Sequence, residues 1–344
     1  MIGNFLSDHI GTRSYCEDLA IRLSRGNWKP ITASDKSSRP VRLLDMLDRT
    51  WRYRHHYRVA LVDVFNGRAF IWAEAVCLLL RYLKKSHILV IRAGNMPQFA
   101  KKYPVAMKNL LRYAFAVTTP SRYLAQELAF LGMEIQVIPN AIDLSTYKFE
   151  QRSMLQPRLV WLRAFHRDYN PLMAIEAVGY LRADFPEIQL TMIGPDKHDG
   201  TLVSIYKAIT QLGLQNNIVL REAIPKSKVP DTLASYDIFL NTTSAESFGV
   251  SVMEAAATGL CIVSTAVGEL PLIWKNEYSA LLIPSGDSWV MAQAVRRILT
   301  DSDLALRLSC NARATAEHYD WSTILPQWEQ LLTRASLVST RSEV

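Results

Sequence analysis

Long apolar runs, C-x-x-C pairs and glycine-rich nucleotide fingerprints are all missing from this sequence of 344 residues. The longest fully apolar run extends from Ala75 to Leu80, whereas a membrane-spanning helix needs about 20 apolar residues. The chain does not open with a basic segment and an apolar core, so no secretory leader is expected. Neither a P-loop nor a G-x-G-x-x-G motif occurs, so these two kinds of phosphate-binding loop are not expected.

The cysteines indicate the redox environment of the protein, and the net charge indicates the kinds of ligand that it favours. Its four cysteines, Cys16, Cys77, Cys261 and Cys310, are far apart, so neither a disulfide framework nor a zinc site is predicted. This usage fits a reducing cytoplasm. The formal net charge is +7. Such a charge favours an anionic ligand, a nucleic acid or an acidic membrane surface without choosing among them.

One pattern of strands and helices occurs twice along the chain. Because 49% of the residues are hydrophobic, a chain of this length can bury two ordinary domain cores. Alternating strands and helices are typical of parallel sheets covered by helices, so we predict an α/β protein with two Rossmann-like, doubly wound parallel-sheet domains. The predicted strands are 59–65, 88–91, 115–118, 158–162, 188–193, 218–220, 238–240 and 261–264, and the helices of the first half lie near 13–25, 70–84 and 121–132.

The domain boundaries follow from local composition. The run Ile138 to Asp143 is predicted to end a first domain (1–150), and the polar run through Gln156 is predicted to be a linker to a second domain (151–320). Trp321 and Trp328 are predicted to anchor a final helical segment (321–344) as core residues. Ligands of doubly wound sheets bind beyond the carboxyl ends of the strands, so a cleft between two such domains is the expected site.

Two carboxylates separated by seven residues, Glu246 and Glu254, bracket a small-residue turn between an apolar run and a helix-forming run. Gly249 allows close approach of the backbone to a ligand, and the first free helix amides, at Val250 and Ser251, suit a phosphate group. The two carboxylates are placed to accept hydroxyls from two parts of one ligand. Alternatively, Glu246 caps the helix and Glu254 lies on a solvated face.

The segment from Trp161 to Pro284 resembles the nucleotide-sugar half of a GT-B glycosyltransferase of family 4, whose E-x7-E motif Glu246 and Glu254 match. Other motifs follow in the order typical of that family. Arg163 stands after the first strand of the second domain, Gly194-Pro195 after the next strand, and Gly268-Glu269-Leu270-Pro271 in place of G-G-x-P-E. Looser matches in the first half are the loop at Gly11, Thr119-Pro120-Ser121 and Ile138-Pro139-Asn140.

The resemblance implies an activity and a set of roles. It implies sugar transfer with retention of configuration from a nucleoside-diphosphate sugar to a glycan or lipid-linked acceptor, without a metal or another cofactor. The two domains would face across a cleft, with the acceptor on the first domain, the donor on the second and residues 321–344 returning to the first. The resemblance assigns catalytic roles to Arg163, near the diphosphate, and to Glu246, near the donor sugar. It assigns donor binding to Gly11, Gly194, Pro195, Phe248, Gly249, Val250, Ser251 and Glu254.

The chain departs from the family pattern at three places. Tyr169 occupies the position of a lysine that helps to neutralise the donor diphosphate, so His166 and Arg167 are candidates for the missing charge. The loop that carries a histidine in many members contains Arg92 and Asn95 instead, and both are candidate phosphate or acceptor contacts. Each of these arginines is alternatively a surface charge. Glu269 replaces a glycine of the family motif.

The basic and aromatic run from Trp51 to Arg58 is typical of a surface for anionic lipid or nucleic acid, although a helix end explains it equally well. No nucleic-acid-binding motif accompanies the run, so a nucleic acid is not expected as a partner. The sequence therefore predicts a cytoplasmic glycosyltransferase of surface polysaccharide or lipopolysaccharide synthesis, with peripheral contact to the anionic inner membrane face left open. The alternatives are a glycan- or nucleotide-binding protein without turnover and a sugar-nucleotide epimerase.

Overall fold

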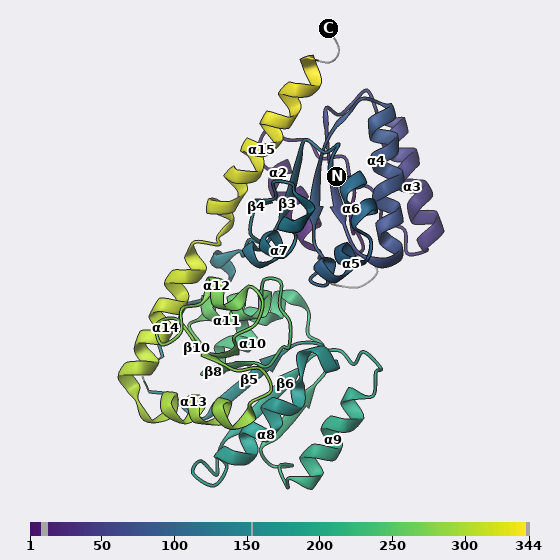
Figure 1. The fold of residues 1–344 in the computed structure, drawn as a ribbon. Helices are drawn as coiled ribbons and strands as arrows, with labels where there is room; N and C mark the ends of the chain where they lie inside the picture. The colour runs from purple at the N-terminus through teal and green to yellow at the C-terminus, as the bar shows by residue number, and fades with distance from the viewer. Residues whose placement is uncertain (8–12, 153, 342–344) are drawn as a thin grey trace. The chain divides into compact units, whose positions relative to one another are not determined.

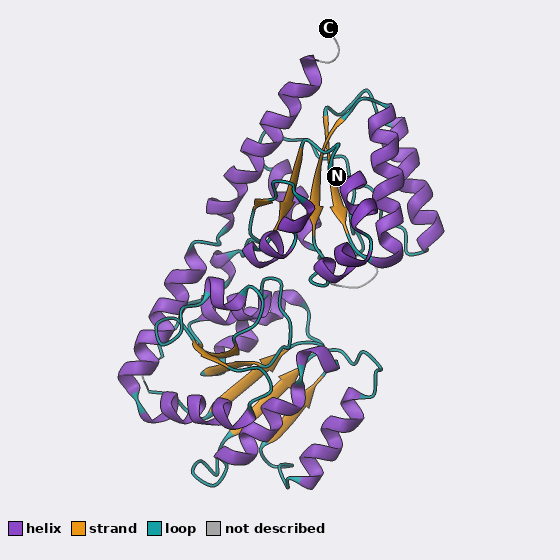
Figure 2. Ribbon diagram, viewed as in Figure 1, coloured by secondary structure: helices purple, strands orange, loops and turns teal. Residues whose placement is uncertain are grey.

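The computed structural model describes residues 1–7, 13–152 and 154–341. The chain divides into two compact units, which are described separately. The first unit consists of Met1–Ala141 and Ser322–Val344, and the second consists of Ile142–Trp321. Figure 1 follows the chain through both units, and Figure 2 shows strands between helices in each of them.

The first unit is built on a parallel sheet in the order β1-β2-β3-β4. Ile2 extends this sheet beyond β1, because it forms parallel bridges to Val62 and to Ala33. The strands are formed by apolar runs whose side chains are almost fully buried, as at Ile88 and Leu89. Their bounds are β1 Val59–Val64, β2 Ser86–Ile91, β3 Ala116–Thr119 and β4 Gln136–Val137.

Helices cover the first sheet, and α3 and α4 lie side by side along one flank of it (Figure 1). The last helix carries Trp328, which is buried and donates a hydrogen bond from Nε1 to the hydroxyl of Tyr15 (3.2 Å). The helices of this unit are α2 Tyr15–Ser24, α3 Arg39–Arg52, α4 Phe70–Tyr82, α5 Met96–Lys102, α6 Pro104–Leu111, α7 Arg122–Glu127 and α15 Trp321–Arg341, with 3-10 turns η1 Gly67–Ala69 and η2 Ala129–Leu131.

The second unit is built on a parallel sheet in the order β10-β9-β8-β5-β6-β7. Its strands are β5 Arg158–Leu162, β6 Gln189–Ile193, β7 Ile218–Arg221, β8 Ile238–Asn241, β9 Cys261–Thr265 and β10 Leu281–Ile283. Its helices are α8 Pro171–Leu181, α9 Thr201–Gln211, α10 Val229–Ala234, α11 Val250–Thr258, α12 Leu270–Ile273, α13 Ser288–Thr300 and α14 Ser302–Glu317, with 3-10 turns η3 Leu144–Thr146, η4 Arg167–Tyr169 and η5 Lys226–Lys228.

The strand order of the second sheet creates a switch point. The chain begins at β5, moves outward through β6 and β7, and then returns to place β8 on the other side of β5. Loops that leave β5 and β8 at their carboxyl ends therefore run to opposite faces of the sheet, and ligands of doubly wound sheets bind at such a point. In this chain these two loops begin at Arg163 and Thr242.

The predicted fold class, α/β with two parallel sheets, is confirmed, and so is the burial of Trp321 and Trp328. The predicted boundary near residue 150 moves to between Ala141 and Ile142. The run through Gln156, predicted as a linker, is instead part of the second unit, in which Tyr147 and Arg152 are buried.

Arg152 attaches this segment to the rest of the second unit through a buried ion pair and hydrogen bonds. Its guanidinium lies 3.4 Å from the carboxylate of Asp237 and donates hydrogen bonds to the backbone oxygens of Ala234 and Tyr236. The Asp237 side chain is 4% exposed. Arg152 and Asp237, although charged, are therefore part of the buried core, because each is paired with other polar groups.

We expect Arg152→Met to lower the free energy of unfolding of the second unit by about 3 kcal/mol, because it removes one partner of a buried ion pair and leaves carbonyl groups unpaired. Urea denaturation is the measurement, and Arg307→Met, at an exposed arginine of α14, is the matched control. Equal stability of the two variants would contradict this account of the segment.

Candidate functional site

Arg163 and Glu246 meet at the switch point of the second sheet. Arg163 directly follows β5, and its Nη2 forms an ion pair with Oε2 of Glu246, which follows β8. The side chains of Arg163 and Glu246 are 19% and 10% exposed. The other carboxylate oxygen of Glu246 accepts hydrogen bonds from the backbone N–H groups of Ser247 (3.0 Å) and Phe248 (3.3 Å). The carboxylate is therefore held in place from two sides.

Burial has left part of the Arg163 guanidinium without a partner. Its Nε is buried and has no hydrogen-bond partner among the described residues. The guanidinium lies 4.8 Å from the centre of the Tyr169 ring, a distance at which a cation is attracted to the ring face. Burial lowers the pKa of Arg163, while Tyr169 and Glu254 act in the opposite direction. Arg163 is thus a largely buried cation that is paired with Glu246 and keeps a buried N–H group without a partner among the described residues.

Two glycines allow the backbones of this site to approach each other. A Cβ atom at Gly194, after β6, would overlap the backbone oxygen of Arg163. Pro195 follows in the same turn and accepts a hydrogen bond from the N–H of Phe165 (2.9 Å). Gly268 has a φ of +56°, and a Cβ atom there would overlap the backbone oxygen of Glu246. These contacts fix the loops that carry Arg163 and Glu246.

The amino end of α11 lies directly after the Glu246 loop. Gly249 adopts a φ of +87° at the N-cap and makes no side-chain cap bond. Phe248 is buried in the core and packs edge-on against Tyr319, so only its backbone is available to a ligand. Val250 is exposed, whereas Ser251 is 7% exposed and its Oγ has no hydrogen-bond partner among the described residues.

Glu254 lies one turn further along α11 and is 5% exposed. Its Oε1 accepts a hydrogen bond from the hydroxyl of Tyr147 (3.0 Å) and lies 3.3 Å from Nζ of Lys226. Burial, followed by the charge of Glu254, raises the pKa of Tyr147, which keeps that hydroxyl protonated. The alternative with Glu246 as a helix cap and Glu254 on a solvated face is therefore wrong. Sequence reasoning missed Tyr147 and Lys226, since no local pattern links them to Glu254.

The turn η4 and His166, which precedes it as the N-cap, contain the other candidates of the second unit. Nδ1 of His166 accepts a hydrogen bond from the N–H of Asp168 (3.2 Å). The N–H of Arg167 donates to Asp199 (3.1 Å), and hydrogen bonds from Thr201 and Arg167 lower the pKa of Asp199 to about 2. The Arg167 side chain is exposed. Neither residue forms a hydrogen bond or an ion pair with Arg163 or Glu246 within the described chain.

The candidates of the first unit have a separate environment. Arg92 is not a surface charge: its side chain is 9% exposed, and its Nε donates to Asp63 (3.1 Å) while Nη1 donates to Asn140 (3.0 Å). Asn95 is exposed and accepts a hydrogen bond from Asn66 (2.6 Å). Gly11 lies outside the described residues.

No group of three or more His, Cys, Asp or Glu side chains with the arrangement of a metal site occurs in the described part of the chain. Asp301 and Asp303 have a spacing that resembles a metal-binding pair. Asp301, however, caps α14 by accepting a hydrogen bond from the N–H of Leu304 (2.9 Å). This pair is explained by the helix.

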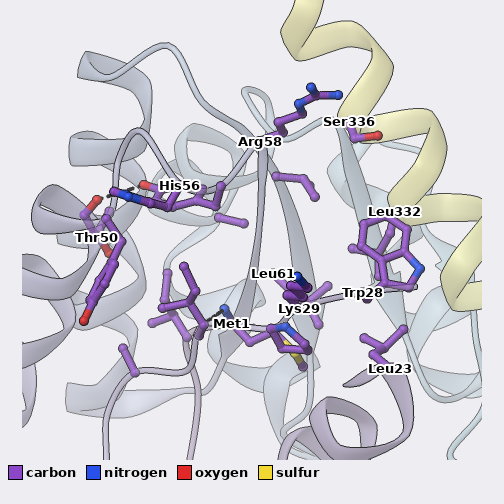
Figure 3. A pocket seen from close by; sticks show the side chains of 18 of the residues that line it. Met1, Leu23, Trp28, Lys29, Thr50, His56, Arg58, Leu61, Leu332 and Ser336 are labelled. Carbon is purple, nitrogen blue, oxygen red and sulfur yellow. Dashed lines mark hydrogen bonds between the residues drawn. The ribbon is translucent and has the colours of Figure 1, made fainter. Parts of the chain in front are cut away.

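Among the described residues of the first unit, one cavity lies at each end of the sheet. The one in Figure 3, of about 430 Å³, lies at the amino ends of the strands, next to Met1, Trp28 and Leu61. The other, of about 410 Å³, lies at the carboxyl end of β1, next to Asn4, Asp63 and Asn66. Parallel α/β sheets bind ligands at their carboxyl ends, so the second cavity is the functional candidate of this unit.

Comparison with known proteins gives the family of the second unit. Residues 147–315 match the family model described as Glycosyl transferases group 1. The D-inositol 3-phosphate glycosyltransferase of Corynebacterium efficiens is 26% identical over 170 residues, which are 48% of this chain and 40% of that protein. The phosphatidylinositol N-acetylglucosaminyltransferase GPI3 subunit of Saccharomyces cerevisiae is 28% identical over 219 residues, 61% of this chain and 47% of that protein. The chain thus spans about half the length of these curated relatives or less.

Solved structures resemble the chain over most of its length. HepE of Anabaena, solved in complex with UDP and glucose, has a TM-score of 0.72 at 18% identity and covers 89% of this chain and 86% of its own. Sucrose-phosphate synthase of Thermosynechococcus elongatus has a TM-score of 0.73 at 17% identity, with 90% and 82% covered. A glycosyltransferase of Rickettsia africae has a TM-score of 0.68 at 16% identity, with 92% and 87% covered. These likenesses confirm the predicted GT-B fold.

We expect Gly268→Ala to destabilise the second unit by about 1 to 3 kcal/mol more than Gly286→Ala does, as measured by urea unfolding. Both glycines have positive φ, and alanine is strained at either position. Only at Gly268 does the added Cβ meet the backbone of Glu246, because no atom lies within 4 Å of the corresponding position at Gly286. Equal losses in the two variants would show that the close approach to Glu246 carries no weight.

Proposed function

Since the chain belongs to the glycosyl transferases group 1 family through residues 147–315, we propose that it is a retaining, metal-independent glycosyltransferase. It moves a sugar from a nucleoside-diphosphate sugar to a glycan or lipid-linked acceptor. The observation that carries this proposal is a pair of buried donors without partners among the described residues, Arg163 Nε and Ser251 Oγ, at the carboxyl edge of the second sheet. Buried donors of this kind are costly unless a ligand accepts from them.

In the proposed site, Arg163 and the first amides of α11 bind the diphosphate of the donor. Helix amides and a guanidinium both suit phosphate oxygens. When the bond between the anomeric carbon and the phosphate oxygen breaks, its electron pair leaves with the nucleoside diphosphate, and these fixed donors stabilise the developing charge. The acceptor hydroxyl oxygen forms the new bond to the anomeric carbon, and its proton goes to the phosphate oxygen of the leaving nucleoside diphosphate.

The two carboxylates have different tasks in this proposal. Glu246, held by Arg163 and two backbone amides, positions the donor sugar. Glu254, held by Tyr147 and Lys226, accepts the ribose hydroxyls. Gly194, Pro195 and Gly249 keep the backbone close to the ligand. Tyr169 holds the Arg163 guanidinium against its ring rather than supplying a second cation.

We further propose that the protein works at the cytoplasmic face of a membrane in the synthesis of surface polysaccharide or lipopolysaccharide. The net charge of +7 supports contact with an anionic surface. In the described chain, no helix has the length and apolar content required to cross a bilayer.

The direct test is donor turnover. We expect the protein to hydrolyse or transfer at least one member of a panel of UDP, GDP and ADP sugars, and UDP sugars come first because HepE was solved with UDP. Chromatographic separation of the products before mass spectrometry distinguishes the alternatives, because epimers have equal masses but differ in retention. Nucleotide binding without turnover supports a binding protein, an epimerised sugar without acceptor supports an epimerase, and the absence of both turnover and a nucleotide-dependent thermal shift contradicts the proposal.

We expect Arg163→Ala to weaken UDP binding by about 1.5 to 3 kcal/mol, the contribution of a hydrogen bond to a charged group. Calorimetry with UDP and with uridine separates phosphate recognition from nucleoside recognition, because uridine affinity should not change. An equal loss for both ligands would place the diphosphate away from Arg163.

We expect Glu254→Gln to weaken UDP binding by about 1.5 to 3 kcal/mol, because the neutral amide is a poorer acceptor for ribose hydroxyls. Glutamine keeps an oxygen for the Tyr147 hydroxyl, so the fold should be preserved. Glu222→Gln, at an exposed position after β7, is the matched control. UDP affinity equal to that of the control would remove Glu254 from the site.

A further inference from the structure

The cavity of about 410 Å³ at the carboxyl end of β1 is lined by an unusual excess of positive charge. Its volume lies within the range of small-molecule sites, about 300 to 1,000 Å³. Three arginines line it: Arg39 and Arg42 come from the first turn of α3, and Arg68 comes from η1. Among the described residues of its lining, Asp63 is the only acidic one.

The carboxylate of Asp63 is already paired with another arginine, Arg92. The carboxylate is 4% exposed and lies 3.1 Å from Nε of Arg92. Arg92 in turn packs over the ring of Tyr15. Asp63 is therefore one member of a buried pair and leaves the three arginines of the cavity without a counter-charge from the described lining.

Within the described chain, none of the three arginines forms an ion pair, and Arg42 donates hydrogen bonds to neutral groups only. Arg42 donates to the backbone oxygens of Lys36 (2.7 Å) and Ser37 (3.5 Å) and to Oδ1 of Asn4 (3.3 Å). Arg39 and Arg68 have no ion pair among the described residues. Burial and then the charge of Arg39 lower the pKa of Arg42. Guanidiniums that converge without an acid repel each other, and an anion between them removes that repulsion.

An aromatic ring in the wall of the cavity, that of Trp72, helps to hold the guanidinium of Arg42 in place. The guanidinium of Arg42 lies 5.7 Å from the centre of the Trp72 ring on α4, within the range of a cation–π contact. The hydrogen bonds to Lys36 and Ser37 hold the guanidinium from another side. Arg42 is thus preorganised, whereas Arg39 and Arg68 are exposed and free to close on a ligand.

We propose that this cavity binds a phosphate group of the acceptor, so that the acceptor is a phosphorylated molecule rather than a neutral sugar. The proposal rests on the proposed glycosyltransferase function, because it assigns the acceptor of that reaction. Three guanidiniums match the several oxygens of a phosphate better than the two of a carboxylate. A soluble sugar phosphate and a phospholipid headgroup carry the same group, and the experiment distinguishes these two sources.

The test uses the whole protein with saturating UDP, which occupies the proposed donor site in the second unit. Calorimetry then measures binding of three probes: glycerol 1-phosphate, dihexanoyl phosphatidic acid below its critical micelle concentration, and glycerol. We expect both phosphates to bind and glycerol not to bind. Equal affinities for the two phosphates indicate a soluble source, and at least tenfold tighter binding of the phosphatidic acid indicates a lipid source.

The decisive variant is Arg39→Gln/Arg68→Gln, which changes two exposed side chains that form no ion pair within the described chain and so leaves the fold intact. We expect it to weaken phosphate binding at least tenfold. Arg42→Gln should do the same, although it also loses contacts to the backbone. Arg25→Gln, at an exposed arginine that ends α2, is the control and should bind as the wild type does.

Phosphate affinity that is unchanged in the double variant, or glycerol that binds as tightly as glycerol 1-phosphate, would overturn the assignment. The UDP affinity of each protein is measured in the same experiment. If the wild-type protein does not bind UDP, the proposed function is contradicted. The difference in phosphate affinity between the wild type and the Arg39→Gln/Arg68→Gln variant tests the cavity alone.

Discussion

The candidate donor site depends on the pairing of β5 with β8. These strands are far apart in the sequence, and their adjacency brings the residue after β5 and the loop after β8 to one edge of the sheet. Arg163 and Glu246 meet there as an ion pair. The carboxyl ends of the same strands define the point at which doubly wound sheets bind ligands. The position of the site is therefore a consequence of strand order.

Close packing of the backbone turns this position into a fixed geometry. Gly194 and Gly268 admit the backbones of Arg163 and Glu246 at distances that a Cβ would not allow. The preceding strands are almost fully buried, so the loops are anchored on a rigid core. A rigid site with buried donors left unpaired is costly in the absence of ligand, because desolvated donors are not compensated. That cost is reasonable for a site whose ligand carries a diphosphate.

The sequence predicted most strands of both sheets, because apolar runs are local signals, but it missed the short strands β4 and β10. The resemblance to the family implied that Arg163 and Glu246 act on one donor, and the structure brings the two side chains together. The sequence did not predict that Tyr147 and Lys226 hold Glu254, since both reach that carboxylate only through the packing of distant segments. It also did not predict the burial of Arg92. A loop arginine is usually solvated, and only the neighbouring Asp63 and Asn140 make burial favourable here.

The arginine-lined cavity illustrates the same limit. Arg39, Arg42 and Arg68 are scattered among many basic residues in a chain with a net charge of +7, and only the fold of the first unit brings them to one cavity. Charge composition indicated an anionic partner but not its place. The two units thus present two proposed sites for anions, each at the carboxyl end of a parallel sheet.

A crystal structure of the protein with an intact nucleoside-diphosphate sugar tests the central claim most directly. The account predicts the diphosphate in contact with Arg163 and the amides of Val250 and Ser251, with the ribose on Glu254 and the sugar on Glu246. A nucleotide bound elsewhere, with the Arg163–Glu246 pair and its neighbours untouched, would contradict it.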